Sequence, residues 1–256
     1  MSLTRLRRSV PRLHFPVSLV RLTVLAAVAT VMPVSTAWSG PNEDGLLVFH
    51  TDDDIVYTTD DLAVYSSPAH PTCLSEECPL PPEDPCWADI LDEISPTSAR
   101  GRMVTMFWLI AIFPPDQCPR VSGASFGLWW PDDTEPTFVD WGACGDFELP
   151  FDGWPQPNSG TAVTFLAPQR ARAIRLYWFA AYSYYGPAQI SLTAFPGEQF
   201  PLFADDSVPS ALDSVPRSHR GRVGLNGANG YVPWWDVPPI VEASWGGVKS
   251  RFREED

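Results

Sequence analysis

The segment from His50 to Asp54 has the residue types of a metal site. On an extended strand His50, Asp52 and Asp54 share one face, with about 6.7 Å between neighbours. An imidazole and two carboxylates suit a divalent cation, and an oxygen-rich set favours calcium over zinc. A strand that runs into a solvated acidic turn explains the same residues without a metal. We therefore expect no cofactor, with calcium as the possible exception.

The sequence Gly123-Ala124-Ser125-Phe126-Gly127 fits the G-x-S-x-G pattern of a serine nucleophile. That pattern works where a strand turns sharply into a helix and exposes the serine hydroxyl. Here Leu128-Trp129-Trp130-Pro131 follows, which is typical of a strand closed by proline. His219 completes the serine–acid–histidine order only formally, so a secreted hydrolase is an alternative interpretation and not the preferred one.

Carboxylates are too abundant for their pairs to indicate catalysis. With 31 acidic residues, candidate acid–base pairs arise by chance, and separation in space decides a glycosidase mechanism. We assign no such pair among Asp140, Asp146, Glu148 and Asp152. The dyad Asp205-Asp206 precedes Ser207 and indicates a turn or helix cap.

Tryptophans next to prolines are the candidate ligand-binding residues. Trp154 precedes Pro155, and the pair Trp234-Trp235 follows Pro233, which places all three in turns. Aromatic faces in loops stack on sugars or bind cations, although large rings also fill sandwich cores. We predict that Trp154, Trp234 and Trp235 bind a ligand, with packing over the ends of the sandwich as the alternative.

Five cysteines lie within 72 residues of one another. In an oxidising compartment they indicate disulfides, and the odd number leaves one thiol over. We predict a long-range bridge between Cys118 and Cys144, because both follow predicted strands, and one bridge among Cys73, Cys78 and Cys86.

The first 37 residues are predicted to be a cleaved signal peptide. Five arginines precede the apolar run Leu22–Val34, which small residues follow up to Ala37. The run is too short to span a bilayer, so no membrane anchor is expected after cleavage. Removing positions 1–37 leaves 12 basic against 31 acidic residues, a net charge of −19. That charge disfavours nucleic acid and anionic membranes as partners, and predicts a neutral or cationic ligand.

Period-two alternation predicts the fold. It is clearest over 174–184 and 189–194, which Tyr184-Tyr185-Gly186-Pro187 would join as an antiparallel hairpin. In the run Arg102–Phe113 the residues on both faces of the expected strand are apolar, which predicts a central strand covered on two sides. Further strands are expected at 46–51, 55–58, 122–130, 137–141 and 161–166. The pattern favours an all-β antiparallel sandwich over 38–235, or else a partly open barrel, followed by a poorly ordered tail over 236–256.

Four blocks of the sequence resemble a group of uncharacterised secreted bacterial proteins of similar size. They are LLVFHTDDDIVY from Leu46, DWGACGDFELPFDGWP from Asp140, YWFAAYSYYG from Tyr177 and FADDSVPSALD from Phe203. The resemblance implies a stand-alone exported bacterial domain and carries no activity with it.

Taken together, these features predict an exported, non-catalytic binding or structural module, either extracellular or periplasmic. Its expected partner is a neutral glycan or a protein surface. The alternatives are a secreted hydrolase and a calcium-dependent extracellular module.

Overall fold

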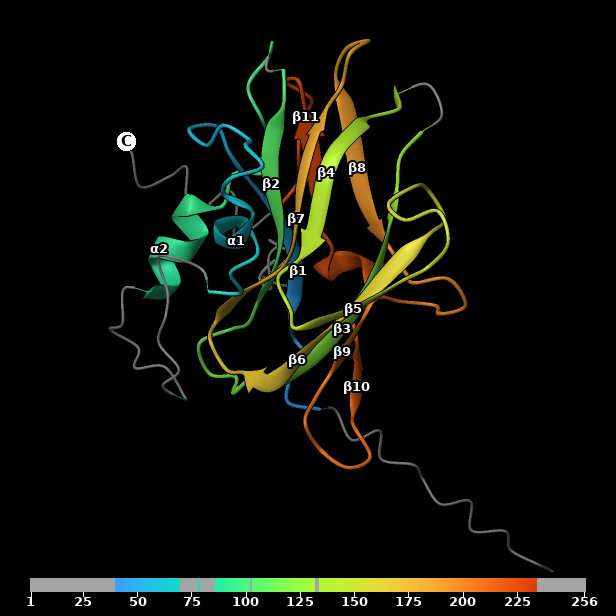
Figure 1. The fold of residues 1–256 in the computed structure, drawn as a ribbon. Coiled ribbons are helices and arrows are strands. Elements are labelled where there is room, and N and C mark those ends of the chain that lie inside the picture. Colours follow the sequence, from blue (N-terminus) through green and yellow to red (C-terminus); the bar gives the residue numbers. More distant parts are fainter. Residues whose placement is uncertain (1–39, 70–77, 79–85, 102, 132–133, 234–256) are drawn as a thin grey trace, which may run out of the picture. The chain divides into compact units, whose positions relative to one another are not determined.

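The computed structural model describes residues 40–69, 78, 86–101, 103–131 and 134–233. The predicted signal peptide, the predicted tail, Trp234, Trp235 and Cys73 lie outside these residues. The described part is an antiparallel β-sandwich of two separate sheets, as expected from the alternating sequence (Figure 1).

Sheet A contains four antiparallel strands in the order β1-β2-β7-β4. They are β1 (Leu46–Asp52), β2 (Thr105–Ile112), β7 (Ala173–Tyr182) and β4 (Thr137–Ala143). In sheet B the order is β10-β9-β3-β6-β5, and a second branch adds β8 beside β3 and β11 beside β8. Its strands are β3 (Val121–Trp129), β5 (Phe147–Pro150), β6 (Gly160–Gln169), β8 (Ala188–Thr193), β9 (Leu202–Ala204), β10 (Leu212–Ser214) and β11 (Arg222–Leu225).

Strand β2 is buried at every position, which confirms the prediction of a strand covered on both sides. Phe107, Leu109 and Ala111 point into the core between the two sheets. Met106 and Trp108 point the other way, into a second core on the outer side of sheet A.

Two short helices cover this outer side of sheet A (Figure 1). Helix α1 (Leu62–Tyr65) contributes the buried ring of Tyr65, and helix α2 (Cys86–Glu93) contributes Ile90. The Trp108 indole N–H donates to the Tyr65 carbonyl over 3.0 Å, and the Arg175 guanidinium lies over the Trp108 ring. None of the described helices is long and apolar enough to cross a membrane.

Two expectations about strands are wrong. The segment 55–58 is not a strand, although Ile55 and Tyr57 pack against the second core. The segments 174–184 and 189–194 do not form a hairpin, because β7 pairs within sheet A and β8 within sheet B. The turn between them carries the chain from one sheet to the other, so each strand finds its partners elsewhere.

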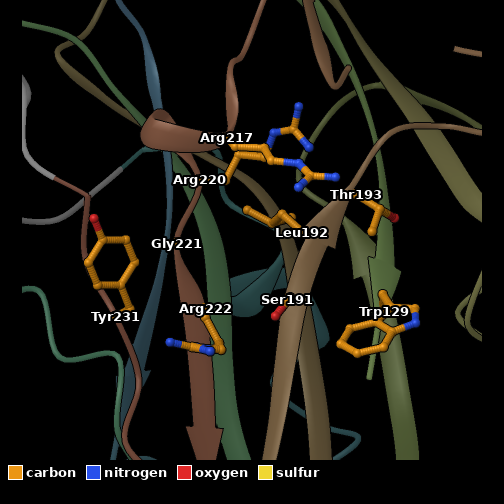
Figure 2. A pocket seen from close by; sticks show the side chains of 9 residues that line it. All are labelled: Trp129, Ser191, Leu192, Thr193, Arg217, Arg220, Gly221, Arg222 and Tyr231. Atoms are coloured by element: carbon orange, nitrogen blue, oxygen red, sulfur yellow. The ribbon is translucent and has the colours of Figure 1, made fainter. Parts of the chain in front are cut away.

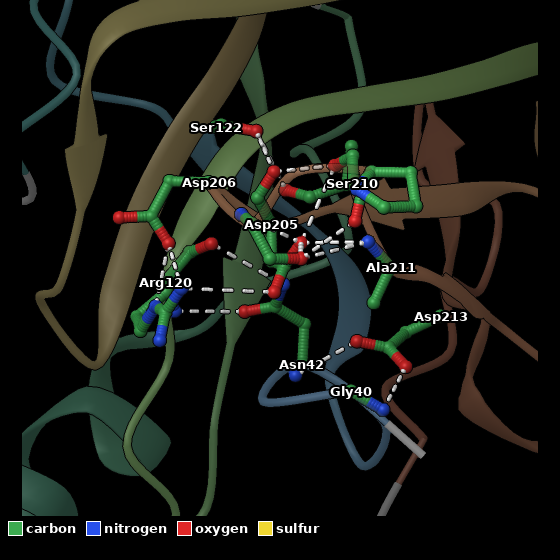
Figure 3. A network of polar contacts seen from close by, with 12 residues as sticks. Gly40, Asn42, Arg120, Ser122, Asp205, Asp206, Ser210, Ala211 and Asp213 are labelled. Carbon is green, nitrogen blue, oxygen red and sulfur yellow. Dashed lines mark hydrogen bonds and ion pairs between the residues drawn. The ribbon is translucent and has the colours of Figure 1, made fainter. Parts of the chain in front are cut away.

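A polar network fixes the β9–β10 hairpin to the start of the domain (Figure 3). The Asp213 carboxylate accepts hydrogen bonds from the backbone N–H groups of Gly40 and Asn42, over 2.6 and 2.9 Å. The Asn42 side chain in turn accepts the backbone N–H of Arg120 over 2.9 Å. Chain segments about 170 residues apart are therefore joined through a single carboxylate.

Asp205 closes the turn of the same hairpin, which confirms that the acidic dyad marks a turn. Its side chain is buried and accepts hydrogen bonds from Ser207, Ser210 and the backbone N–H of Ala211. Burial by itself would raise the pKa of Asp205, but these hydrogen bonds lower the pKa below its ordinary value. Asp206 is more exposed and pairs with Arg120 and Arg170.

We predict that Asp205→Asn lowers the free energy of unfolding by about 1–3 kcal/mol, because buried donors lose a charged acceptor. A carboxylate with a lowered pKa stabilises the fold above the unfolded value and loses that contribution as pH falls through the folded value. Acid unfolding of the wild type below about pH 4 should therefore be steeper than that of the variant. Asp206→Asn is the control and should cost less than about 1 kcal/mol. Equal losses in both variants, measured by urea titration followed by circular dichroism, would contradict this role.

Candidate functional site

The outer surface of sheet B over β5, β6, β3, β9 and β10, here called the open face, is the candidate functional site. Strand register places its side chains in two adjacent rows across β5, β6, β3, β9 and β10. One row is Phe147, Thr164, Gly123, Ala204 and Leu212, and the other is Leu149, Ala162, Ser125, Leu202 and Ser214. The residues between these rows point inward, as the strand period requires, and all of them are buried except the half-buried Glu148.

Large apolar side chains form the two sides of the open face. Phe147 and Leu149 are 61% and 58% exposed on β5, and Leu212 is 63% exposed on β10. Phe151 follows β5 in the same alternation and packs edge-on against Phe195. Small residues between the two sides leave a hollow of about 180 Å³. The open face is therefore a shallow apolar groove.

Ser125 lies on the floor of this groove, in the middle of β3. Its hydroxyl donates to the Glu198 carboxylate over 2.6 Å. A β-carbon at Gly127 would lie 2.6 Å from the carbonyl oxygens of Ala194 and Ser159, so this glycine is required by close backbone packing. The G-x-S-x-G pattern thus belongs to a strand interior and not to the sharp strand-to-helix turn of a nucleophile.

Carboxylates lie around the β5 end of the open face. Asp146 and Asp152 flank β5 and are exposed, and Glu198 lies at the floor. Arg120 and Arg170 are close to Asp206 and are paired with it. The electrostatic potential along the β5 side is therefore negative, which favours basic groups beside an apolar surface.

The predicted metal ligands His50, Asp52 and Asp54 do not come together as a site. His50 accepts the backbone N–H of Ser95 at Nδ1 over 3.2 Å, and Asp52 accepts the backbone N–H of Asp54 over 2.9 Å. Burial lowers the pKa of His50, with opposing contributions from neighbouring carboxylates. Strand β1 ends at Asp52, so the extended spacing on which the prediction rested stops there. Within the described ranges, no group of three or more His, Cys, Asp or Glu residues is arranged to hold a metal ion.

Trp154 is a core residue, so its prediction as an exposed ligand platform is wrong. It is 9% exposed and packs against Phe126 and Phe179. Its indole N–H donates to the Tyr177 hydroxyl over 2.8 Å, and that hydroxyl donates to Glu148 over 2.7 Å. Burial, reinforced by the Glu148 charge, raises the pKa of Tyr177. The turn containing Pro155 directs the indole into the sandwich and not toward solvent.

The predicted bridge between Cys118 and Cys144 is also wrong. Cys118 pairs with Cys78, which lies 40 residues earlier in the sequence, with 5.4 Å between the two Cα atoms. Cys144 is a free thiol, buried in the second core, and it donates to the Tyr65 carbonyl. Cys118 thus lies in the exposed loop between β2 and β3, whereas Cys144 is buried in the second core. Cys73 lies outside the described residues, so a bridge within the Cys73–Cys86 segment stays a prediction.

Sequence reasoning missed strand β5 and with it the apolar side of the open face. The signal was present in Phe147-Glu148-Leu149-Pro150-Phe151, where apolar and other residues alternate at the period of a strand. Two prolines and a nearby glycine hid this alternation, because proline in a short run argues against a strand except at an edge. In the structure β5 is an edge strand.

Comparison with known proteins gives a limited likeness. No family model matches the sequence, and no curated protein matches it. Among solved structures, the chain is similar to the cohesin module from a Clostridium perfringens ATCC13124 family 33 glycoside hydrolase, at 7% identity and a TM-score of 0.36 over 51% of this chain and 89% of that one. It is also similar to a type II cohesin domain from the cellulosome of Acetivibrio cellulolyticus, at 10% identity and a TM-score of 0.36 over 52% and 90%. These values describe a partial likeness in fold and nothing about activity.

We predict that Trp154→Ala lowers the free energy of unfolding by about 3–5 kcal/mol, because it empties a packed core position and leaves Tyr177 without its donor. Trp129→Ala is the matched control, since Trp129 lies at the surface and is 44% exposed. The Trp129→Ala substitution should lower the free energy of unfolding by less than about 1 kcal/mol. Thermal and urea unfolding measure both variants, and a larger loss for Trp129 would contradict the burial of Trp154.

We also predict that native Cys144 resists alkylation by iodoacetamide at pH 8. Burial raises the pKa of the thiol, and the folded chain excludes the reagent. Peptide mass mapping without reduction should find the Cys144 peptide unlabelled in native protein and labelled after guanidinium denaturation. It should also find Cys78 joined to Cys118.

Proposed function

We propose that this chain is an exported, non-catalytic protein-binding module that docks its partner on the open face. The observation that carries the proposal is the contrast between the two outer surfaces of the sandwich. Helices and loops cover the outer surface of sheet A, whereas the outer surface of sheet B presents Phe147, Leu149 and Leu212 to solvent. Contiguous exposed apolar side chains are typical of interaction surfaces.

The energetics support a docking role for these side chains. Each large apolar side chain that moves from water into an interface contributes about 1.5–3 kcal/mol. The strands that carry them are rigid parts of a sheet, so little conformational entropy is lost on binding. The open face is thus organised for binding before the partner arrives.

The charge around the groove defines the chemistry of the partner. Asp146, Asp152 and Glu198 favour an apolar surface flanked by lysine or arginine. A second copy of this chain is a poor partner, because the sequence carries a net charge of −14 and like charges repel. We therefore propose a different protein with an apolar, basic-flanked surface.

Two further features support export. Positions 1–37 have the sequence pattern of a signal peptide. The Cys78–Cys118 disulfide fits an oxidising compartment, where such bonds persist.

Selection of phage-displayed 12-residue peptides on the full chain tests the proposal. We expect enriched peptides in which apolar residues alternate with lysine or arginine. The double variant Phe147→Ser/Leu149→Ser should weaken their binding at least tenfold, because it removes the apolar side of the groove. Val56→Ser, at an exposed apolar position away from sheet B, is the matched control and should leave the affinity within twofold.

Two results would overturn the proposal. Peptides rich in Asp and Glu, or peptides that bind the double variant as well as the wild type, would remove the open face as a basic-partner site. A wild-type dimer in sedimentation velocity that Phe147→Ser/Leu149→Ser dissociates would assign the face to self-association instead. Melting temperatures of all variants within a few degrees of the wild type establish that the fold is retained.

A further inference from the structure

Beyond the open face, sheet B carries a second concave surface, here called the arginine pocket. It has a volume of about 480 Å³ and lies where β3, β8 and β11 run side by side (Figure 2). Trp129 is paired with Ser191, Ser191 with Arg222, and Arg222 with Tyr231. These four residues form one row across the sheet, about 14 Å long at the strand spacing of ~4.8 Å. Arg217 and Arg220 stand beside this row (Figure 2).

Positive charge is concentrated in the arginine pocket. Positions 38–233 contain nine arginines and no lysine, and three of these nine line this one pocket. Among the described residues, no carboxylate forms a salt bridge with Arg217, Arg220 or Arg222. The arginine pocket is therefore a local cationic site on an acidic protein.

Two of these guanidinium nitrogens are buried and have no hydrogen-bond partner among the described residues. Nη2 of Arg220 and Nε of Arg222 have no hydrogen-bond acceptor within the described part of the chain. Arg220 is held in place by its Nε–H, which donates to the Val215 carbonyl over 2.9 Å, and by the Phe200 ring beneath it. Burial, together with the Arg217 charge, lowers the pKa of Arg220. A buried unpaired donor costs about 1–3 kcal/mol, so an anion that reached these groups would be stabilised by them.

The remaining residues of the arginine pocket suit a ring with hydroxyl groups. Trp129 and Tyr231 are 44% and 47% exposed and lie at the two ends of the row. Such rings stack on the apolar faces of sugars, while Ser191 and Thr193 supply hydroxyls to the same pocket. Arginine binds carboxylate and sulfate groups through two parallel hydrogen bonds.

We propose that the arginine pocket binds an acidic saccharide, a sugar that carries carboxylate or sulfate groups. Its rings stack on Trp129 and Tyr231, and its anionic group accepts hydrogen bonds from Arg222 and the arginines beside the row. This differs from the neutral or cationic ligand expected from net charge. Long-range repulsion is screened over about 8 Å at physiological salt, whereas these guanidinium groups would touch the ligand directly. The inference is independent of the open face and of its protein partner.

Isothermal titration calorimetry on the full chain tests this inference. The probes are trigalacturonate, its uncharged methyl ester, a sulfated galactose disaccharide and a hexaglutamate peptide. We expect binding of at least one of the two acidic saccharides, and at least tenfold weaker binding of the methyl ester and of the peptide. Arg222→Gln and Arg217→Gln should each weaken saccharide binding at least tenfold. Trp129→Ala should weaken it less, by a few fold.

Arg170→Gln is the matched control, because Arg170 is an exposed arginine paired with Asp206 on another part of the surface. The Arg170→Gln variant should bind the acidic saccharide with the affinity of the wild type. Arg217 is exposed, so Arg217→Gln keeps the test valid if Arg222→Gln loses stability.

Three results would overturn the inference. Hexaglutamate that binds more tightly than both saccharides would make the arginine pocket a peptide site. If Arg170→Gln reduced the saccharide affinity as much as Arg222→Gln does, the binding would reflect general attraction to positive charge. Failure of both trigalacturonate and the sulfated disaccharide to bind the wild type would remove the arginine pocket as a saccharide site.

Discussion

The apolar character of β2 and β7 on both of their faces is the constraint on which the rest of this structure depends. A strand of this kind must be covered on two sides, because each exposed large side chain would forfeit about 1.5–3 kcal/mol. Sheet B covers one side of sheet A and shares with it the core that contains Phe107 and Phe179. Ile55, Tyr57 and the helices α1 and α2 cover the other side. Among the described residues, helices cover the outer side of sheet A, whereas Phe147, Leu149 and Leu212 of sheet B are exposed.

The sequence was sufficient to predict the fold class and the long strands. Alternation over 174–184 and 189–194, together with the two-sided apolar run at Arg102–Phe113, specifies strands because these patterns follow directly from side-chain burial. Pairing could not be predicted in the same way. The turn at Tyr184-Tyr185-Gly186-Pro187 is compatible with a hairpin and with a crossing between sheets, and only the packing of whole sheets decides between them. The short strands β9, β10 and β11 have too few residues for a period to be detected.

Candidate sites were harder to predict than strands, because they depend on residues that are distant in sequence. Trp154 lies in a turn as expected, yet its indole enters the core, since a turn residue can point to either side of the chain. Cys118 and Cys144 each follow a predicted strand, but Cys118 is exposed in a loop and Cys144 is buried in the second core. Arg217, Arg220 and Arg222 are close together in sequence, and a net charge averaged over the chain concealed their local effect. Their partner aromatic Trp129 comes from another strand, which single-sequence reasoning has no means to join to them.

Strand β5 has a further consequence, which concerns aggregation. An edge strand with exposed apolar side chains offers unpaired backbone groups to other chains and so invites fibre-like stacking. Here the edge is only four residues long, ends at Pro150, and carries the inward-pointing charge of Glu148, all of which block strand addition. Side chains on the face of the sheet remain accessible while its hydrogen-bonding edge is protected. The exposed apolar side chains therefore lie at a sheet margin whose hydrogen-bonding edge resists the addition of further strands.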